Sequence, residues 1–359
     1  MPSNYGSLLQ AIATQRIIER MGHNCQIIDY RNRDEVGWKA VRNQLKNKPN
    51  WSNSLIKRCV YYAFQTPGHM LAERKFDKMR RQFLELTAPC FSMEDLREKC
   101  KSDVVVTGSD QVWGPVINAE FDQAYFLKFC DSSNTKKIAY AASFGKSSFS
   151  DDLKMQFKTL LSDYRHITVR EDKAVEILKE LGIDNKGQVL DPTLLLTGDE
   201  WSELIKKDIH KDYILIYQIH NNPKLDAFAR KLSSKTGLPL LRVTPSLHQI
   251  SRAGRLVLLP DLDMFLSYLK NCRYLVTDSF HGTAFAINLN VQFIEILPEN
   301  GTNSRNQSLL KMTGLLDRIA TNSDDISIFK DEIDYKPVNE IIQNERQKSL
   351  LLLRNMIEK

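Results

Sequence analysis

Apolar and polar positions along the chain follow two alternating patterns. Short runs rich in β-branched and aromatic residues predict strands at Cys25–Asp29, Asp103–Thr107, Ile138–Ala142, His166–Val169, Tyr213–Ile219, Leu240–Val243, Leu256–Leu259, Tyr274–Thr277 and Val291–Ile296. Between them, apolar residues at helical spacing predict helices at Ser7–Met21, Asp151–Tyr164, Glu171–Leu181, Leu225–Lys235, Leu262–Asn271 and Thr283–Asn288. Repeated strand-helix units build mostly parallel sheets that helices cover on both faces. The pattern therefore predicts an α/β protein.

The strand-helix units fall into two series, which predict two lobes. A charged stretch with a glycine, LLLTGDEWSELIKKDIHKD at residues 194–212, separates the series. At 359 residues the chain is also long for a single hydrophobic core. We therefore expect an N-terminal lobe at residues 1–200 and a C-terminal lobe at 201–359. A last amphipathic helix, at about Val338–Ile357, is expected to pack back across the lobes.

A segment at about residues 31–87 departs from the alternation, because it contains no clear strand. Residues 57–81 of this segment contain only two acidic residues, Glu73 and Asp77. Over the same span the basic residues are Lys57, Arg58, Arg74, Lys75, Lys78, Arg80 and Arg81. The pattern predicts a basic helical insert. Its ordinary interpretation is a solvated helical face, and the sharper alternative is an arm that binds anions or faces a membrane.

The start of the chain is the second departure. Asn4-Tyr5-Gly6-Ser7 predicts a turn into the helix Ser7–Met21, which Gly22 ends. In a strand-helix series an apolar strand should lead into that helix, and only three residues precede Asn4. We expect that strand, of about five β-branched residues, to be encoded upstream of Met1 and to lie beside Asp103–Thr107.

Composition narrows the class of protein. Apolar residues make up 42% of the chain, the net charge is +6, and the six cysteines form no CxxC pair. No stretch is typical of a signal peptide or a membrane-spanning helix, so we expect a soluble cytoplasmic protein. The modest charge favours acidic small molecules or an anionic surface over nucleic acid. Motifs for dinucleotides, NTPs, α/β-hydrolases and metals are missing, and we expect neither a cofactor nor a metal.

Polar residues gather where the predicted strands end, which is the edge where open parallel sheets bind ligands. Gly108-Ser109-Asp110-Gln111 follow one strand, Arg170 another, Asp278-Ser279-Phe280-His281-Gly282 a third, and Arg305 lies on the loop after the last. Two arginines, carboxylates and a histidine suit a small polyanion. The residues alone thus predict an anionic substrate between the lobes, without the reaction.

His281 is the strongest candidate for proton transfer. A helix N-terminus lowers an imidazole pKa and favours a neutral ring that accepts a proton, and Asp278 beside it is a candidate to hold the tautomer. Each candidate also has a structural interpretation. His281 could be a capped polar residue at the lobe interface, Arg170 could pair with Glu171 or Asp172, and Asp110 could cap a helix. Trp113 is expected to pack in the core.

Five motifs together resemble the polysaccharide pyruvyl transferase family, in the same order and over residues 4 to about 320. They are Asn4-Tyr5-Gly6 with Leu9-Gln10, Gly108-Ser109-Asp110-Gln111-Val112-Trp113, Arg170-Glu171-Asp172-Lys173-Ala174, Leu190-Asp191-Pro192-Thr193, and Asp278-Ser279-Phe280-His281-Gly282-Thr283-Ala284-Phe285-Ala286. The resemblance implies two Rossmann-like lobes in the arrangement called GT-B. It also implies transfer of pyruvate from phosphoenolpyruvate to a sugar of a bacterial surface polysaccharide or its lipid-linked precursor, giving a cyclic ketal and phosphate.

The resemblance also assigns residues. The family's phosphoenolpyruvate-binding arginine of the first lobe falls on Arg170, and its Arg-Leu-His triplet falls on Ser279-Phe280-His281. The histidine is kept and the arginine is lost, so Arg305 becomes the candidate replacement. We expect His281 and Asp110 to be the acid-base pair, with their order open. The expected substrate-binding residues are Arg170, Arg305, Ser279, Gly282, Asn4, Gly6, Ser109 and Gln111.

Two other functions stay open at this point. One is a GT-B glycosyltransferase that uses a sugar nucleotide, and the other is a non-catalytic scaffold of a polysaccharide assembly complex. The expected partners are phosphoenolpyruvate, a saccharide acceptor and an anionic membrane at its inner face, with no nucleic acid.

Overall fold

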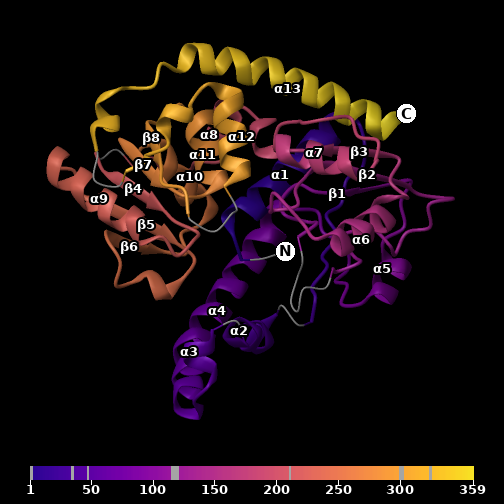
Figure 1. Ribbon diagram of the computed structural model, residues 1–359, viewed down its shortest axis with the longest axis horizontal. Helices are drawn as coiled ribbons and strands as arrows, with labels where there is room; N and C mark the ends of the chain where they lie inside the picture. Colours follow the sequence, from indigo (N-terminus) through magenta and orange to yellow (C-terminus); the bar gives the residue numbers. More distant parts are fainter. Residues whose placement is uncertain are drawn as a thin grey trace.

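The chain folds around two parallel β-sheets, which lie on opposite sides of the molecule (Figure 1). The computed structural model describes residues 3–33, 36–46, 48–114, 121–209, 212–298, 303–322 and 326–359. The prediction of an α/β protein with two parallel sheets is confirmed. All the strands of the first sheet precede residue 170 and all those of the second follow residue 213, so the predicted boundary near residue 200 falls between the sheets.

The first sheet has three strands in the order β1-β2-β3, all parallel. The strands are β1 (Val104–Thr107), β2 (Lys136–Ala142) and β3 (His166–Val169). Three helices belong to this lobe: α5 (Met93–Lys99), α6 (Asp151–Leu161) and α7 (Asp172–Glu180). Trp113 is fully buried here among phenylalanines, which confirms its predicted core position.

The second sheet has five parallel strands in the order β6-β5-β4-β7-β8. The strands are β4 (Ile214–Tyr217), β5 (Leu240–Thr244), β6 (Arg255–Leu258), β7 (Tyr274–Thr277) and β8 (Phe293–Glu295). The helices are α8 (Gly198–Ser202), α9 (Pro223–Thr236), α10 (Leu262–Lys270), α11 (Phe280–Asn288) and α12 (Ser304–Thr313). Every residue of β4 and β7 is buried, because both strands lie inside the sheet and are covered on both faces.

Two helices connect the lobes. In α1 (Tyr5–Arg20), the Tyr5 ring stacks on Phe265 of α10 at 4.1 Å, and its hydroxyl donates to the Pro260 carbonyl at 2.6 Å. The last helix, α13 (Tyr335–Glu358), crosses above both sheets (Figure 1). Lys136 of β2 donates to a carbonyl near its end, Ile357, at 2.8 Å. The lobes therefore share one continuous apolar core along these helices.

The predicted basic insert forms a helical arm that projects away from both lobes (Figure 1). It consists of α2 (Gly37–Lys46), α3 (Pro49–Ser52) and the 29-residue α4 (Leu55–Phe83). Helix α4 is long, but in the described ranges no helix is both long and apolar enough to cross a bilayer.

The predicted strand Cys25–Asp29 is wrong as a regular strand. The segment makes isolated parallel bridges at Ile27 to Leu86 and at Tyr30 to Cys90. On its other side lies a cavity whose far wall includes Val104 and Val106 of β1. Because β1 is the edge strand of its sheet and a cavity runs beside it, the strand expected next to Asp103–Thr107 is not formed by the described residues.

Candidate functional site

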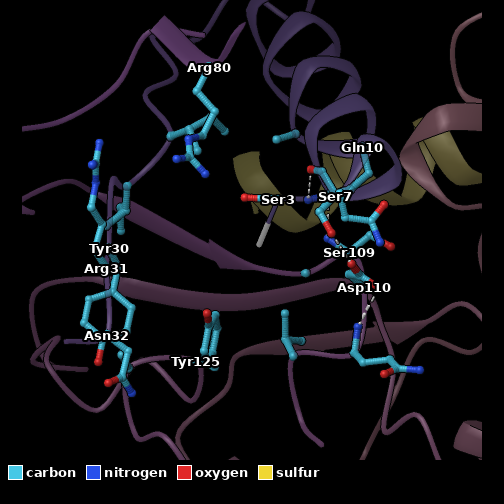
Figure 2. Close-up of a pocket in the computed structure, with 18 of the residues that line it drawn as sticks. Ser3, Ser7, Gln10, Tyr30, Arg31, Asn32, Arg80, Ser109, Asp110 and Tyr125 are labelled. Atoms are coloured by element: carbon cyan, nitrogen blue, oxygen red, sulfur yellow. Dashed lines mark hydrogen bonds between the residues drawn. The ribbon is translucent and has the colours of Figure 1, made fainter. Parts of the chain in front are cut away.

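The candidate site is part of a large cavity, of about 2190 Å³, which residues of both lobes and of the arm line. Figure 2 shows part of this lining, with Ser109 and Asp110 of the first lobe and Arg80 of the arm. Seven of the ten predicted site residues line it: Asn4, Ser109, Asp110, Gln111, Ser279, His281 and Arg305. The other three, Gly6, Arg170 and Gly282, do not. Most of the residues predicted from the sequence to form the site therefore lie around one cavity.

Asp110 projects from the turn after β1 toward the start of α1. Ser7 donates to its Oδ2 at 2.7 Å, and Gln10 of the same helix accepts from the Ser109 amide at 3.1 Å (Figure 2). The preceding Gly108 has a φ of +106°, and any Cβ there would run into the carbonyl of Tyr140. The turn therefore needs glycine, which lets the carboxylate reach the helix.

Arg170 lies one layer below the cavity and is fully enclosed. Its guanidinium donates to Asp191 Oδ2 at 2.9 Å and to Asp110 Oδ1 at 3.2 Å, and it lies 4.4 Å above the Phe280 ring. Burial raises the pKa of both carboxylates, but the charge of Arg170 contributes to the opposite effect, which wins and holds both pKa values below the usual range. Arg170 keeps Asp110 and Asp191 ionised; its predicted contact with phosphoenolpyruvate stays a prediction.

His281 is buried in the first turn of α11, with only 8% of its surface exposed. Its Nε2 lies 3.8 Å from Asp191 Oδ2 and has no hydrogen-bond partner among the described residues. Burial is the main cause that lowers the pKa of His281, against the nearby charges of Asp191 and Asp110. The imidazole is therefore neutral near pH 7. The direction agrees with the sequence-based expectation, although its principal cause is burial.

The prediction that Asp278 holds the His281 tautomer is wrong. Asp278 accepts the backbone amides of Ile219 and His220, at 2.7 and 3.2 Å. The carboxylate that faces His281 is instead Asp191. Asp191 is missing from the predicted site residues, although its Leu-Asp-Pro-Thr motif could have revealed it.

Gly6 allows the first turn of α1 to pack against His281. A Cβ at Gly6 would overlap Nδ1 of His281, so only glycine lets α1 pack against the imidazole. Asn4 caps the helix by accepting from the Gly6 amide at 2.8 Å. Gly6 is thus a packing partner of the predicted catalytic residue.

Ser279 occupies the position where the family resemblance places an arginine. It is the N-cap of α11, and its Oγ accepts from the Gly282 amide at 3.2 Å. The amide of Gly282, a predicted substrate-binding residue, is therefore occupied by a helix cap in this structure. Ser279 itself lines the cavity and leaves room there, because its side chain is short.

Arg305, in the first turn of α12, reaches the same cavity from the second lobe. With the Gln111 amide oxygen turned toward it, Gln111 accepts from Nη1 and Nη2 at 2.8 and 2.5 Å. Burial and the charge of Arg170 lower the pKa of Arg305 to about 10, so the guanidinium stays charged near neutral pH. It is a cavity-lining cation whose hydrogen-bond partner is a neutral amide.

A further buried carboxylate, Glu171, belongs to the same cluster. Ser143 donates to its Oε1 at 2.7 Å, while its Oε2 has no hydrogen-bond partner among the described residues. Burial raises the pKa of Glu171 in spite of Arg170 nearby. Within the described ranges, no three His, Cys, Asp or Glu side chains are placed to hold a metal ion together.

Taken together, the cavity holds a neutral imidazole, an ionised carboxylate and a guanidinium within one enclosed region. Such a set is able to move a proton and to hold an anion. Its members come from the turn after β1, α11 and α12, so it is complete only when the two lobes are together.

Two solved structures with a similar fold are described as UDP-N-acetylglucosamine 2-epimerases. UDP-GlcNAc 2-epimerase from Methanocaldococcus jannaschii aligns with a TM-score of 0.52 at 14% identity, over 96% of each chain. A protein from Listeria monocytogenes described as a UDP-N-acetylglucosamine 2-epimerase aligns with a TM-score of 0.50 at 12% identity, over 79% of this chain and 86% of its own. At these identities the likeness concerns the fold, and it confirms the predicted GT-B-like arrangement.

The chain's own sequence is matched by one family model. A search of curated proteins finds no match. The model for polysaccharide pyruvyl transferase, however, matches residues 4–299, most of the chain and both sheets. On this match, together with the five motifs in register, the protein belongs to the polysaccharide pyruvyl transferase family.

Proposed function

We propose that the protein transfers pyruvate from phosphoenolpyruvate to a saccharide, forms a cyclic ketal on two hydroxyls and releases phosphate. The observation that carries this proposal is the cavity that His281, Asp110 and Arg305 line together. The family supplies the reaction class, a pyruvyl transfer. These three residues supply the groups that such a transfer requires: an acid-base pair and a cation.

The protons balance with the two groups as they stand. An acceptor carries two hydroxyl protons; one ends on the donor's methylene carbon, which becomes a methyl group, and the other ends on the released phosphate. His281 is neutral and Asp110 ionised near pH 7, so both begin as proton acceptors. The proton delivered to the methylene carbon must therefore come from an acceptor hydroxyl or from the donor phosphate, relayed by one of this pair.

The donor's charges need cations, and Arg305 is well placed among the predicted residues. It lines the cavity, and its side chain contacts the neutral amide of Gln111. A guanidinium presents paired donors that match a carboxylate or phosphate. Arg170 lies deeper with two ionised carboxylates, so we propose that it keeps Asp110 ionised in addition to its predicted role in binding.

A specific observation also supports the second candidate, a GT-B glycosyltransferase. The similar solved structures have names that include UDP-GlcNAc, a sugar nucleotide. A chain with this fold that bound UDP-sugars and ignored phosphoenolpyruvate would fit that class. A chain that bound no donor would fit the scaffold.

A thermal-shift series with phosphoenolpyruvate, UDP-sugars and GDP-sugars separates the three functions. We expect phosphoenolpyruvate alone to raise the melting temperature, since a ligand that binds only the folded state stabilises it by mass action. Arg305→Ala should abolish the shift, whereas the exposed control Arg230→Ala should retain it. A shift with sugar nucleotides but none with phosphoenolpyruvate would refute the proposal.

His281→Gln tests the proton-transfer role separately from binding. We expect it to keep the phosphoenolpyruvate shift while phosphate release falls by about 10²–10⁴-fold, the usual effect of losing a general acid or base. Full activity in this variant would assign the proton transfer to another residue.

The acceptor in this proposal is a sugar of a surface polysaccharide or its lipid-linked precursor. A lipid-linked acceptor places the reaction at the inner face of a membrane, with the protein bound peripherally. The basic arm supports this location, since it combines positive charge with exposed apolar residues.

A further inference from the structure

The outer part of the helical arm is poorly supported by the rest of the molecule. We define the arm tip as residues 37–46 and 48–71, which comprise α2, α3 and the first part of α4. Along α4, the buried residues after position 71 are Ala72, Phe76, Met79 and Arg80, whereas only Tyr61 and Gly68 are buried before it. The same helix thus changes from a packed base to a largely exposed tip.

Exposed apolar side chains form a stripe along the tip. Ile56, Val60, Phe64 and Leu71 are 77%, 40%, 75% and 50% exposed. Their spacing of four, four and seven residues puts them on one side of the helix. Trp38, Trp51 and Leu55 are exposed on the same arm tip. A stripe that no described residue covers is typical of a surface with an external partner.

The charge of the arm tip indicates which kind of partner it binds. Residues 37–71 contain six basic side chains, Lys39, Arg42, Lys46, Lys48, Lys57 and Arg58, and no Asp or Glu, although the chain has 44 acidic residues elsewhere. A second copy would bring two such basic surfaces together, which like-charge repulsion disfavours. The partner must therefore be anionic as well as apolar.

We propose that the arm tip docks on an anionic membrane surface. The apolar stripe would enter the boundary between lipid headgroups and acyl chains, and the basic side chains would lie among the lipid phosphates. Two exposed tryptophans fit this location, because the indole ring favours the membrane interface. An acidic protein would satisfy the charges, but it gives no comparable reason for exposed indoles beside an apolar stripe.

The arm also connects this surface with the candidate site. Phe64 and Gly68 of α4 line the same cavity as Asp110 and His281. Gly68 packs against Leu247 of the second lobe, where a Cβ would crowd the leucine side chain. A lipid-linked saccharide held at the arm tip would therefore have a path to the site. This last step rests on the proposed function; the membrane contact does not.

Sedimentation of the full-length protein with vesicles tests the contact. We expect it to bind vesicles of phosphatidylcholine and phosphatidylglycerol, to ignore phosphatidylcholine alone, and to dissociate as salt rises. Lys57→Ala with Arg58→Ala should weaken binding by about fivefold per charge. The double variant Arg230→Ala with Lys235→Ala, on exposed positions of α9, should not.

The contribution of the apolar stripe is tested with a second variant and its matched control. Ile56→Ser with Phe64→Ser should weaken anionic binding at least tenfold, while Met155→Ser with Leu351→Ser, which removes similarly exposed side chains on α6 and α13, should leave it unchanged. Equal binding of the wild type to neutral and anionic vesicles would overturn the proposal. Binding to soluble polyglutamate but not to vesicles would do so too, and would indicate an acidic protein partner.

Tryptophan fluorescence provides a readout that needs no weakened variant. Of the four tryptophans, Trp113 and Trp201 are fully buried, while Trp38 and Trp51 are exposed. Anionic vesicles should shift the emission to shorter wavelength, and Trp38→Phe with Trp51→Phe should remove the shift while the protein still sediments. Unchanged emission of vesicle-bound wild type would rule out insertion of the tip. A failed donor shift alongside normal vesicle binding would refute only the proposed reaction.

Discussion

Both lobes contribute side chains to the region of the same cavity, but the charged groups of the two lobes are paired in different ways. In the first lobe, Asp110 and Asp191 share the enclosed guanidinium of Arg170, so each charge has an opposite partner within 3.2 Å. In the second lobe, the nearest partner of Arg305 is a neutral amide, and His281 Nε2 has no hydrogen bond in the described chain. The second sheet is also the larger, with five strands against three.

This difference separates two tasks. Paired charges in the first lobe hold their protonation state and geometry, because each group stabilises the ionised form of the other. In the second lobe burial favours the neutral forms instead, because it lowers the pKa of His281 and raises the pKa of Glu295. Arg170 thus helps to keep Asp110 and Asp191 ionised in the first lobe, whereas burial keeps His281 neutral in the second.

The largest expected difference between the two lobes is the loss of stability when the arginine of each is removed. Arg170→Ala would leave the buried Asp191 and the partly exposed Asp110 without the cation that they share, and it should lower the free energy of unfolding by about 3–5 kcal/mol. Arg305→Ala should cost only about 1 kcal/mol, because one hydrogen-bonded contact to an amide is lost. Urea unfolding of both variants measures the contrast. Equal losses would show that both arginines are structural.

A substitution at Gly6 tests the contact between α1 and His281. A Cβ there would push against the His281 ring, so Gly6→Ala should lower the free energy of unfolding by about 1–3 kcal/mol. It should also reduce phosphate release by about 10²-fold, as a misplaced catalytic group does.

The matched control for Gly6 is Gly198→Ala. Its Cβ would clash with the carbonyl of Asn288 in a comparable way, but the atoms that it would meet belong to Asn288 and Leu289 and not to His281. We expect a similar loss of stability with phosphate release nearly unchanged at a temperature where both variants are folded. If both variants lose activity equally, the effect at Gly6 arises from destabilisation alone.

The last expected effect is a pH dependence of stability that belongs to the second lobe. Burial raises the pKa of Glu295 to about 8, while hydrogen bonds from Thr283 and Asn306 act in the opposite direction. The folded state then keeps a proton that the unfolded state, with a pKa of 4.5, has lost. This contribution is complete below pH 4.5 and disappears as the pH rises to about 8, at about 1.4 kcal/mol per pH unit.

Glu295→Gln should flatten that decline. The lowered pKa of His281 has the opposite sign, with stability rising with pH up to its unfolded value of 6.5, so the window from pH 6.5 to 8 isolates Glu295. Urea midpoints across this window, for the wild type and the variant, measure the difference. Parallel pH curves would mean that Glu295 is ionised in the folded protein.

Strands with a clear apolar pattern in the sequence could be predicted. The bounds of β3 and β7 agree with the predicted His166–Val169 and Tyr274–Thr277, because each is a short apolar run that ends at a polar turn. Cys25–Asp29 failed for a physical reason. Its described pairing is limited to isolated bridges, Ile27 to Leu86 and Tyr30 to Cys90, so no ladder of consecutive hydrogen-bonded pairs forms, and the sequence does not show which partner a segment will meet.

The sequence by itself determined the α/β class, the family and the polar edge on which Asp110, His281 and Arg305 meet, since strand order and local turns place those residues there. Only the tertiary structure decided which charges pair. Asp191 rather than Asp278 faces His281, and Arg170 is enclosed by Asp110 and Asp191. The pairing depends on burial and on distances between side chains from both lobes, and spacing along the chain carries neither.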